Sequence, residues 1–271
     1  MRLSISNLAW DVSEDQLISE LLNGHKVDAI DVAPGKYFLE PKKATDSDIA
    51  TVRSWWMDRS IEIVGMQALL FGTVGLNIFG SNSVQTQMLD HLSAICRIGS
   101  GLGATKLVFG SPKCRDRGTL SDSEVVNISS KFFEKLGNIA QSYNVIICLE
   151  PNPSHYGANF MMNTEDTVAV VKEINHPAIM MQLDLGAMTI NSELPITIEK
   201  CAKFIGHIHA SEPDLIPLGD FAKSRHEHFS NSIKEFLPNH IVTIEMLASK
   251  TEPHQNAITR ALTTARKFYG K

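Results

Sequence analysis

The sequence predicts a single (β/α)8 TIM barrel, an α/β fold in which eight parallel strands alternate with helices. Its 271 residues are close to the roughly 250 that one such barrel occupies. Eight short apolar segments alternate strictly with amphipathic segments, which predicts parallel strands joined by right-handed helical crossovers. No glycine-rich, serine-rich or proline-rich linker interrupts this alternation, so residues 1–271 are predicted to form one domain.

The first half of the chain supplies four strand–helix pairs. Strands are expected at residues 3–10, 27–32, 61–67 and 105–110. Apolar positions three or four residues apart predict helices near 12–22, 45–56, 84–95 and 121–139. Ser13, Thr45 and Ser121 are expected to cap three of these helices. A doubly wound open sheet usually has a glycine-rich turn after its first strand, and none follows here.

The second half repeats one design four times, an apolar strand that ends on a possible metal ligand. The strands are residues 145–149, 179–183, 204–208 and 241–244, and helices are expected near 165–174, 194–202, 231–236 and 254–269. The residues at the strand ends are Glu150, Asp184, His209 and Glu245. A glutamate that leaves a buried strand is costly unless it is paired or bound to a cation.

The carboxyl ends of barrel strands form the active-site mouth, so these four side chains are expected to point inward there. Carboxylate and imidazole ligands in this mixture suit a divalent ion such as Mn²⁺, Mg²⁺, Co²⁺ or Zn²⁺. The structural alternatives are a salt bridge for the two glutamates, a helix N-cap for Asp184 and a simple hydrogen bond for His209.

Glu150 and Glu245 belong to the fifth and eighth strands, so they are expected on roughly opposite walls with metal and substrate between them. A metal that polarises a carbonyl and its neighbouring hydroxyl acidifies the adjacent C–H bond. One glutamate can then remove the proton and the other can return it. Return at the next carbon is isomerisation, and return to the opposite face of the same carbon is epimerisation.

Composition limits the classes of partner and the cellular compartments that the sequence favours. The net charge of −5 disfavours a nucleic-acid partner, and 43% hydrophobic residues provide a sizeable core. Four cysteines without CxxC spacing fit a reducing compartment, so a cytoplasmic location is expected. Neither a signal peptide nor a membrane-spanning run is predicted, and a homo-oligomer is compatible with the sequence.

At the motif level the chain resembles the xylose-isomerase-like barrel superfamily, and within it the sugar phosphate isomerase/epimerase group and the ketose 3-epimerases. The resemblance rests on 149–152, 183–184, 207–209 and 244–245, with further matches at 65–69, 109–112 and 159–160. It implies that Glu150, Asp184, His209 and Glu245 bind one divalent ion, with Glu150 and Glu245 as the acid/base pair. The implied substrate is a sugar or a sugar phosphate.

The chain departs from the ketose 3-epimerase pattern at two places. Ala187 stands where those enzymes have a substrate-binding histidine, and residues 211–215 lack their arginine. The pocket is therefore expected to be more open beside Ala187, and the favoured substrate to be bulkier or differently substituted there.

Other residues near the predicted mouth complete the proposed site. Substrate contacts are expected from Gln67, His155, Lys113, Arg115, Trp10 and Glu212. His207 and Gln182 share strand faces with the ligands one layer deeper, so a buried supporting role is expected.

Two rival functions remain open on the sequence. One is a metal-dependent AP endonuclease of the endonuclease IV type, which would need more histidines, including one at Ala187, and a less acidic chain. The other is a non-catalytic sugar-binding barrel. Measured turnover separates the second from an enzyme.

Overall fold

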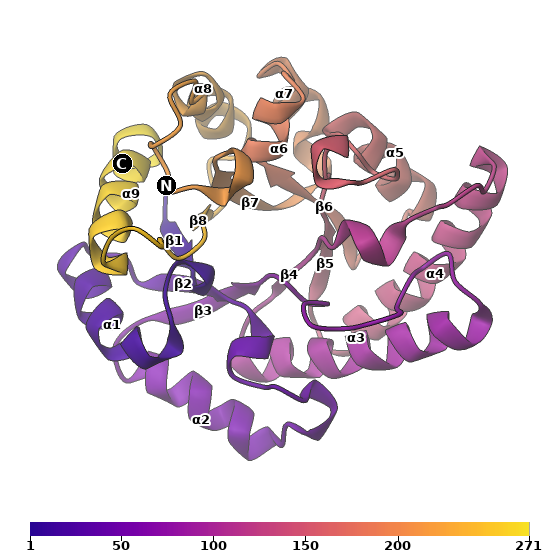
Figure 1. Cartoon of the computed structure of the whole chain (residues 1–271), viewed down its shortest axis with the longest axis horizontal. Coiled ribbons are helices and arrows are strands. Elements are labelled where there is room, and N and C mark those ends of the chain that lie inside the picture. The colour runs from indigo at the N-terminus through magenta and orange to yellow at the C-terminus, as the bar shows by residue number, and fades with distance from the viewer. Residues whose placement is uncertain (271) are drawn as a thin grey trace.

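Eight parallel strands close into a barrel surrounded by helices (Figure 1). The computed structural model describes residues 1–270. Neighbouring strands pair in chain order, and β8 pairs with β1 to close the ring. The strands are β1 (Leu3–Ser6), β2 (Ala29–Val32), β3 (Glu62–Met66), β4 (Lys106–Phe109), β5 (Ile146–Leu149), β6 (Ile179–Asp184), β7 (Ile205–Ser211) and β8 (Val242–Glu245). The predicted (β/α)8 barrel is confirmed.

Helices fill the crossovers between consecutive strands. They are α1 (Asp15–Gly24), α2 (Asp46–Met57), α3 (Asn82–Leu102), α4 (Asp122–Ser142), α5 (Thr164–Ile174), α6 (Leu185–Ile190), α7 (Ile196–Cys201), α8 (His226–Phe236) and α9 (His254–Tyr269). The predicted caps Thr45 and Ser121 are confirmed, because each side chain accepts a backbone N–H from the first turn of its helix. None of the helices described here is both long and apolar enough to cross a membrane.

Some predicted boundaries are wrong. The first strand ends at Ser6 because Asn7–Ala9 form a 3-10 turn, which carries the chain out of the sheet. Ser13 is not an N-cap; it lies inside a 3-10 turn that precedes α1. α8 begins at His226 rather than near residue 231. An additional helix, α6, follows β6 without a loop.

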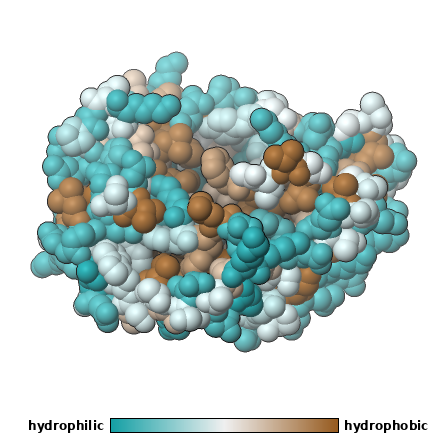
Figure 2. All heavy atoms as spheres, turned by 60° about the horizontal axis from the view of Figure 1, so that its bottom comes forward, coloured by the Kyte–Doolittle hydropathy of each residue, from teal (hydrophilic) through white to brown (hydrophobic). Residues whose placement is uncertain are grey.

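The barrel has an apolar shell and a polar centre. Strand residues that face the helices pack on them. For example, the ring centroids of Phe109 in β4 and Phe133 in α4 are 5.4 Å apart. Other strand side chains meet inside the barrel, where Asp31 of β2 accepts a hydrogen bond from His207 of β7 at 2.6 Å. The face seen in Figure 2 is mostly hydrophilic, and several hydrophobic residues gather around a hollow in it.

Candidate active site and metal centre

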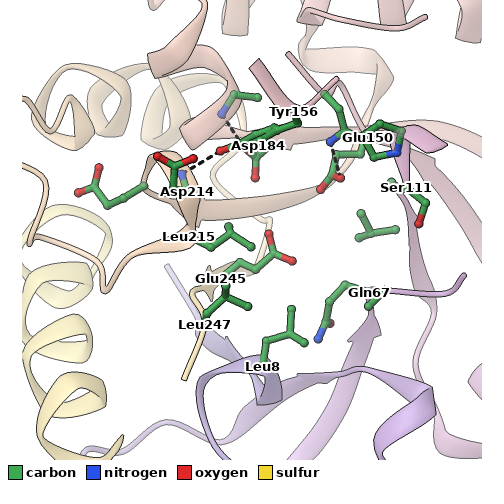
Figure 3. Close-up of a pocket in the computed structure, with 17 residues that line it drawn as sticks. Leu8, Gln67, Ser111, Glu150, Tyr156, Asp184, Asp214, Leu215, Glu245 and Leu247 are labelled. Atoms are coloured by element: carbon green, nitrogen blue, oxygen red, sulfur yellow. Dashed lines mark hydrogen bonds between the residues drawn. The ribbon is translucent and has the colours of Figure 1, made fainter. Parts of the chain in front are cut away.

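The four predicted ligands converge at the carboxyl ends of β5, β6, β7 and β8. One ligand atom from each of Glu150, Asp184, His209 and Glu245 lies within 4.8 Å of the others. His209 Nδ1 is 3.1 Å from Glu245 Oε2 and 3.9 Å from Glu150 Oε1. Figure 3 shows Glu150, Asp184 and Glu245 around one cavity, with Glu150 and Glu245 on different walls. Four strand ends thus place their side chains around a single point.

Two of the three carboxylates in the cluster, Asp184 and Glu150, are held by hydrogen bonds from their neighbours. Asp184 accepts the backbone N–H of Ala187 at 2.6 Å and the hydroxyl of Ser211 at 2.7 Å. Asp184 is therefore the N-cap of α6 as well as a member of the cluster, so the two readings of this residue are compatible. Glu150 accepts a hydrogen bond from the amide of Asn152 at 2.9 Å.

The electrostatics of the cluster favour a cation at its centre. Burial, with the nearby carboxylates of Glu245 and Asp184, raises the pKa of Glu150 to about 8. Burial and Glu245 likewise raise the pKa of Asp184 to about 6. Such shifts mean that several carboxylates share a dry site with too little positive charge.

His209 gives a second sign that a group binds here. Its side chain is completely buried, and neither ring nitrogen has a hydrogen-bond partner within residues 1–270. Buried polar atoms normally have a partner. Three carboxylates and an imidazole are the donors that a divalent transition metal accepts. The residues present therefore fit one divalent ion.

Asp31 lies below His209 and faces its other nitrogen. Asp31 Oδ2 is 3.6 Å from His209 Nε2 and accepts the hydrogen bond from His207. Space for this carboxylate exists because its neighbour on β3 is Gly65, where a Cβ would lie 2.6 Å from Asp31 Oδ2. Carboxylates in this position commonly orient a metal-binding histidine.

A pocket of about 410 Å³ opens above the cluster (Figure 3). Glu150, Asp184 and Glu245 form part of its wall, and the loops after β1, β3, β4, β5, β7 and β8 supply most of the remainder. The other lining residues are Leu8, Gln67, Ala68, Val108, Gly110, Ser111, Pro112, Asn152, Tyr156, Ala187, Glu212, Asp214, Leu215 and Leu247. Its position at the carboxyl ends of the strands is where barrel enzymes hold their substrates.

Comparison with known proteins identifies the family of the chain. Residues 20–256 match the family model described as xylose isomerase-like TIM barrel. The chain belongs to this family. The resemblance inferred from the sequence motifs is thereby confirmed. A comparison with curated proteins finds no match.

Solved structures of sugar epimerases share the fold of this family member. A D-psicose 3-epimerase crystallised with D-fructose matches with a TM-score of 0.82 and 15% identity over 100% of both chains. The D-psicose 3-epimerase of Clostridium cellulolyticum H10 matches with 0.83 and 14%, also over 100% of both chains. The 3-keto-D-glucoside 4-epimerase YcjR of E. coli matches with 0.75 and 13%, over 97% of this chain and 99% of the other.

The structure brings two of the six predicted substrate contacts to the pocket, Gln67 and Glu212. Trp10 does not reach it, because its fully buried indole packs on Trp56 and donates a hydrogen bond to Asp15. Lys113 is exposed outside the lining.

The other two residues predicted to contact substrate, Arg115 and His155, lie near the pocket but do not line it. Arg115 is buried and donates a hydrogen bond to the side chain of Asn152, which in turn donates one to Glu150. His155 is half-exposed and pairs with Asp214 at 2.9 Å, while its neighbour Tyr156 lines the pocket.

The two supporting residues differ. His207 is buried one layer below His209 and donates a hydrogen bond to Asp31. Gln182 is also buried, but its only side-chain hydrogen bond within residues 1–270 is to the backbone of Leu183. It therefore makes no direct contact with a ligand through hydrogen bonding.

Sequence reasoning missed several residues that shape the pocket. Asn152 lies in the same motif as Glu150, and this proximity was the available signal. Ala68, Ser111, Asp214 and Leu215 all line the pocket with left-handed backbone angles, at φ values of 56°, 61°, 59° and 54°. Non-glycine residues in this region are strained, and such strain gathers at functional sites.

Replacing Gly110 with alanine is expected to weaken metal binding by about tenfold or more, because changes around a ligand typically cost that much. A Cβ at Gly110 would lie 2.4 Å from Glu150 Oε2, so the carboxylate must move. Gly35→Ala is the matched control, since a Cβ there meets nothing within 4 Å. The dissociation constant for Mn²⁺ is measured for both variants. Equal constants would contradict the proposal that the Glu150 carboxylate binds the metal from its present position.

Proposed function

We propose that this protein is a divalent-metal-dependent isomerase or epimerase of a sugar or sugar derivative. The observation that carries the proposal is the convergence of Glu150, Asp184, His209 and Glu245 on one point beneath a substrate-sized pocket. Family membership supports it, as does the fold shared with sugar epimerases.

Glu150, Asp184, His209 and Glu245 would hold the metal ion. When bound, such an ion polarises a substrate carbonyl and the neighbouring hydroxyl, and so acidifies the C–H bond beside them. Ser211 and the N-terminus of α6 keep Asp184 in place, while Asn152 does the same for Glu150. Two of the four donors are thereby held by hydrogen bonds.

Glu150 and Glu245 are proposed to move the proton. Their positions on β5 and β8 give access to a bound sugar from two sides. One carboxylate takes the proton from carbon, and the other returns a proton to the opposite face or to the adjacent carbon. Asn152 donates to Glu150 Oε2, which leaves its other oxygen directed toward the cluster.

Epimerisation is the outcome that the comparisons favour. The solved structures with this fold include D-psicose 3-epimerases and a 3-keto-D-glucoside 4-epimerase, which invert a carbon beside a carbonyl. Proton removal and return by two facing carboxylates suits that reaction.

The endonuclease alternative is not favoured by the pocket. Its wall contains carboxylates and no lysine or arginine among the described residues, so a DNA phosphate would meet like charge. A non-catalytic sugar-binding barrel shares the same metal donors and is distinguished by turnover alone.

The function is tested by screening metal-reconstituted protein against ketoses, aldoses, keto-glycosides and sugar phosphates, with product epimers or isomers identified by NMR. Conversion of at least one sugar is expected. Protein with full metal content that converts none of them would contradict an enzymatic role.

Free D-fructose is expected to be a poor substrate for 3-epimerisation. Ala187 offers a methyl group where ketose 3-epimerases place an imidazole, and residues 211–215 contain no arginine, so two polar contacts are missing. The ratio kcat/KM for fructose is expected to lie well below that of the best sugar in the screen. Comparable values would contradict this reading of the pocket.

A further inference from the structure

The pocket is acidic. Five carboxylates line it, those of Glu150, Asp184, Glu212, Asp214 and Glu245. Within residues 1–270, no lysine, arginine or histidine lines the pocket. One divalent ion would neutralise only part of this charge. Arg115 is buried against Asn152, outside the lining. A phosphate dianion would therefore meet carboxylates without a cationic side chain to bind it.

One side of the pocket is a leucine wall, formed by Leu8, Leu215 and Leu247 (Figure 3). They come from three different loops, those after β1, β7 and β8. Backbone hydrogen bonds join these loops, from Leu247 N–H to Leu215 O at 2.8 Å and from Ala248 N–H to Leu8 O at 2.9 Å. The three leucines are thus held in fixed relative positions by the backbone, and they lie next to Glu245 in Figure 3.

Two buried oxygen atoms of pocket residues have no hydrogen-bond partner within the described chain, Gln67 Oε1 and Glu212 Oε2. Gln67 uses its amide nitrogen on Ser6 at 2.7 Å, which leaves the carbonyl free. Glu212 uses its other oxygen, Oε1, to accept the N–H of Gly219. Both side chains are 1% exposed. Orphaned acceptors of this kind call for donors, and sugar hydroxyl groups are donors.

We propose that, given the function proposed above, the substrate is an uncharged sugar carrying an apolar substituent rather than a sugar phosphate. Its hydroxyl groups donate to Gln67 and Glu212, and its apolar group lies on the leucine wall. A phosphate group in place of the apolar group would be repelled by the carboxylates of the pocket. Ala187 leaves room beside the metal ligands for the larger molecule.

Binding of unreactive probes tests this. Mn²⁺-reconstituted protein is titrated calorimetrically with the methyl glycosides of glucose, galactose and mannose, and with the phenyl glycoside and the 1-phosphate of each sugar. The glycosides have no free carbonyl, so binding is measured without turnover. At least one phenyl glycoside is expected to bind about tenfold or more tightly than the methyl glycoside of the same sugar, the gain typical of an apolar contact, and more tightly than the 1-phosphate.

Matched variants locate the contact. Leu247→Ser is expected to remove most of the gain from the phenyl group. Leu17→Ser on the outer face of α1 is expected to leave it unchanged, because Leu17 is similarly exposed, at 45% against 49%, and lies outside the pocket. A 1-phosphate that binds as tightly as its phenyl glycoside would overturn the proposal, as would failure of every phenyl glycoside to bind.

The two proposals fail separately. Phenyl glycosides that bind the leucine wall of a protein that converts no sugar would contradict the enzymatic function alone. Turnover of a sugar phosphate with tight binding would contradict the substrate class alone.

Discussion

Glu150→Gln and Glu245→Gln are each expected to lower turnover by about 10²–10⁴-fold, the usual contribution of a general acid or base. Glutamine keeps the volume of the side chain and loses the oxygen that accepts a proton. The fold should be retained, because both residues lie at strand ends at the pocket wall, outside the apolar shell. The measurement is kcat on the best sugar of the screen, with the circular dichroism spectrum as a check of folding.

Both glutamates are also proposed ligands, so metal content must be determined on the same samples. Glu20→Gln is the control for the chemical change, since Glu20 is exposed on α1. In a two-base mechanism one variant can still exchange the substrate C–H with solvent from one face while making no product. Wild-type turnover by both variants with full metal would show that the pair is structural.

Purified, reconstituted protein is expected to bind close to one divalent ion per chain, and Asp184→Ala or His209→Ala to lose it. His209 is the fully buried proposed ligand between Glu245 and Asp31, and Asp184 is fixed by two hydrogen bonds. Both residues are buried, so a side chain from the protein surface does not reach their positions in the cluster. Elemental analysis and calorimetric Mn²⁺ titration measure the loss.

His228→Ala is the control for the histidine change, because His228 is exposed on α8. A protein that takes up no metal under any reconstitution would remove the basis of the proposed function. Three ions per chain would instead indicate an endonuclease-type site.

The candidate metal cluster was predictable because its signal is local. A buried strand that ends in a carboxylate or imidazole is visible in the sequence, and the barrel geometry brings all such ends to one rim. Glu150, Asp184, His209 and Glu245 all follow this rule. Asp31 did not stand out, because its partner His207 lies five strands further along the chain and reaches it only across the closed barrel.

The pocket wall was less predictable because loops decide it. A short 3-10 turn after β1 places Leu8 on the pocket and turns Trp10 into the core. Asp214 and Leu215 reach the pocket through left-handed backbone angles that no residue pattern announces. Arg115 looked like a substrate clamp from its position after β4, but the turn at Pro112–Arg115 buries it against Asn152.

The central claim is that the strand ends of β5–β8 would hold one divalent ion, and that Glu150 and Glu245 move a proton at a carbon beside a substrate carbonyl. The most direct measurement is deuterium incorporation into a ketose or keto-glycoside substrate in D₂O, followed by NMR while Mn²⁺ is titrated into metal-free protein. Deuterium is predicted to enter at one carbon, the one next to the carbonyl, at a rate that rises with occupancy and saturates near one ion per chain. Product formed at the same rate without metal, or formed with full metal and no deuterium at that carbon, would contradict the account.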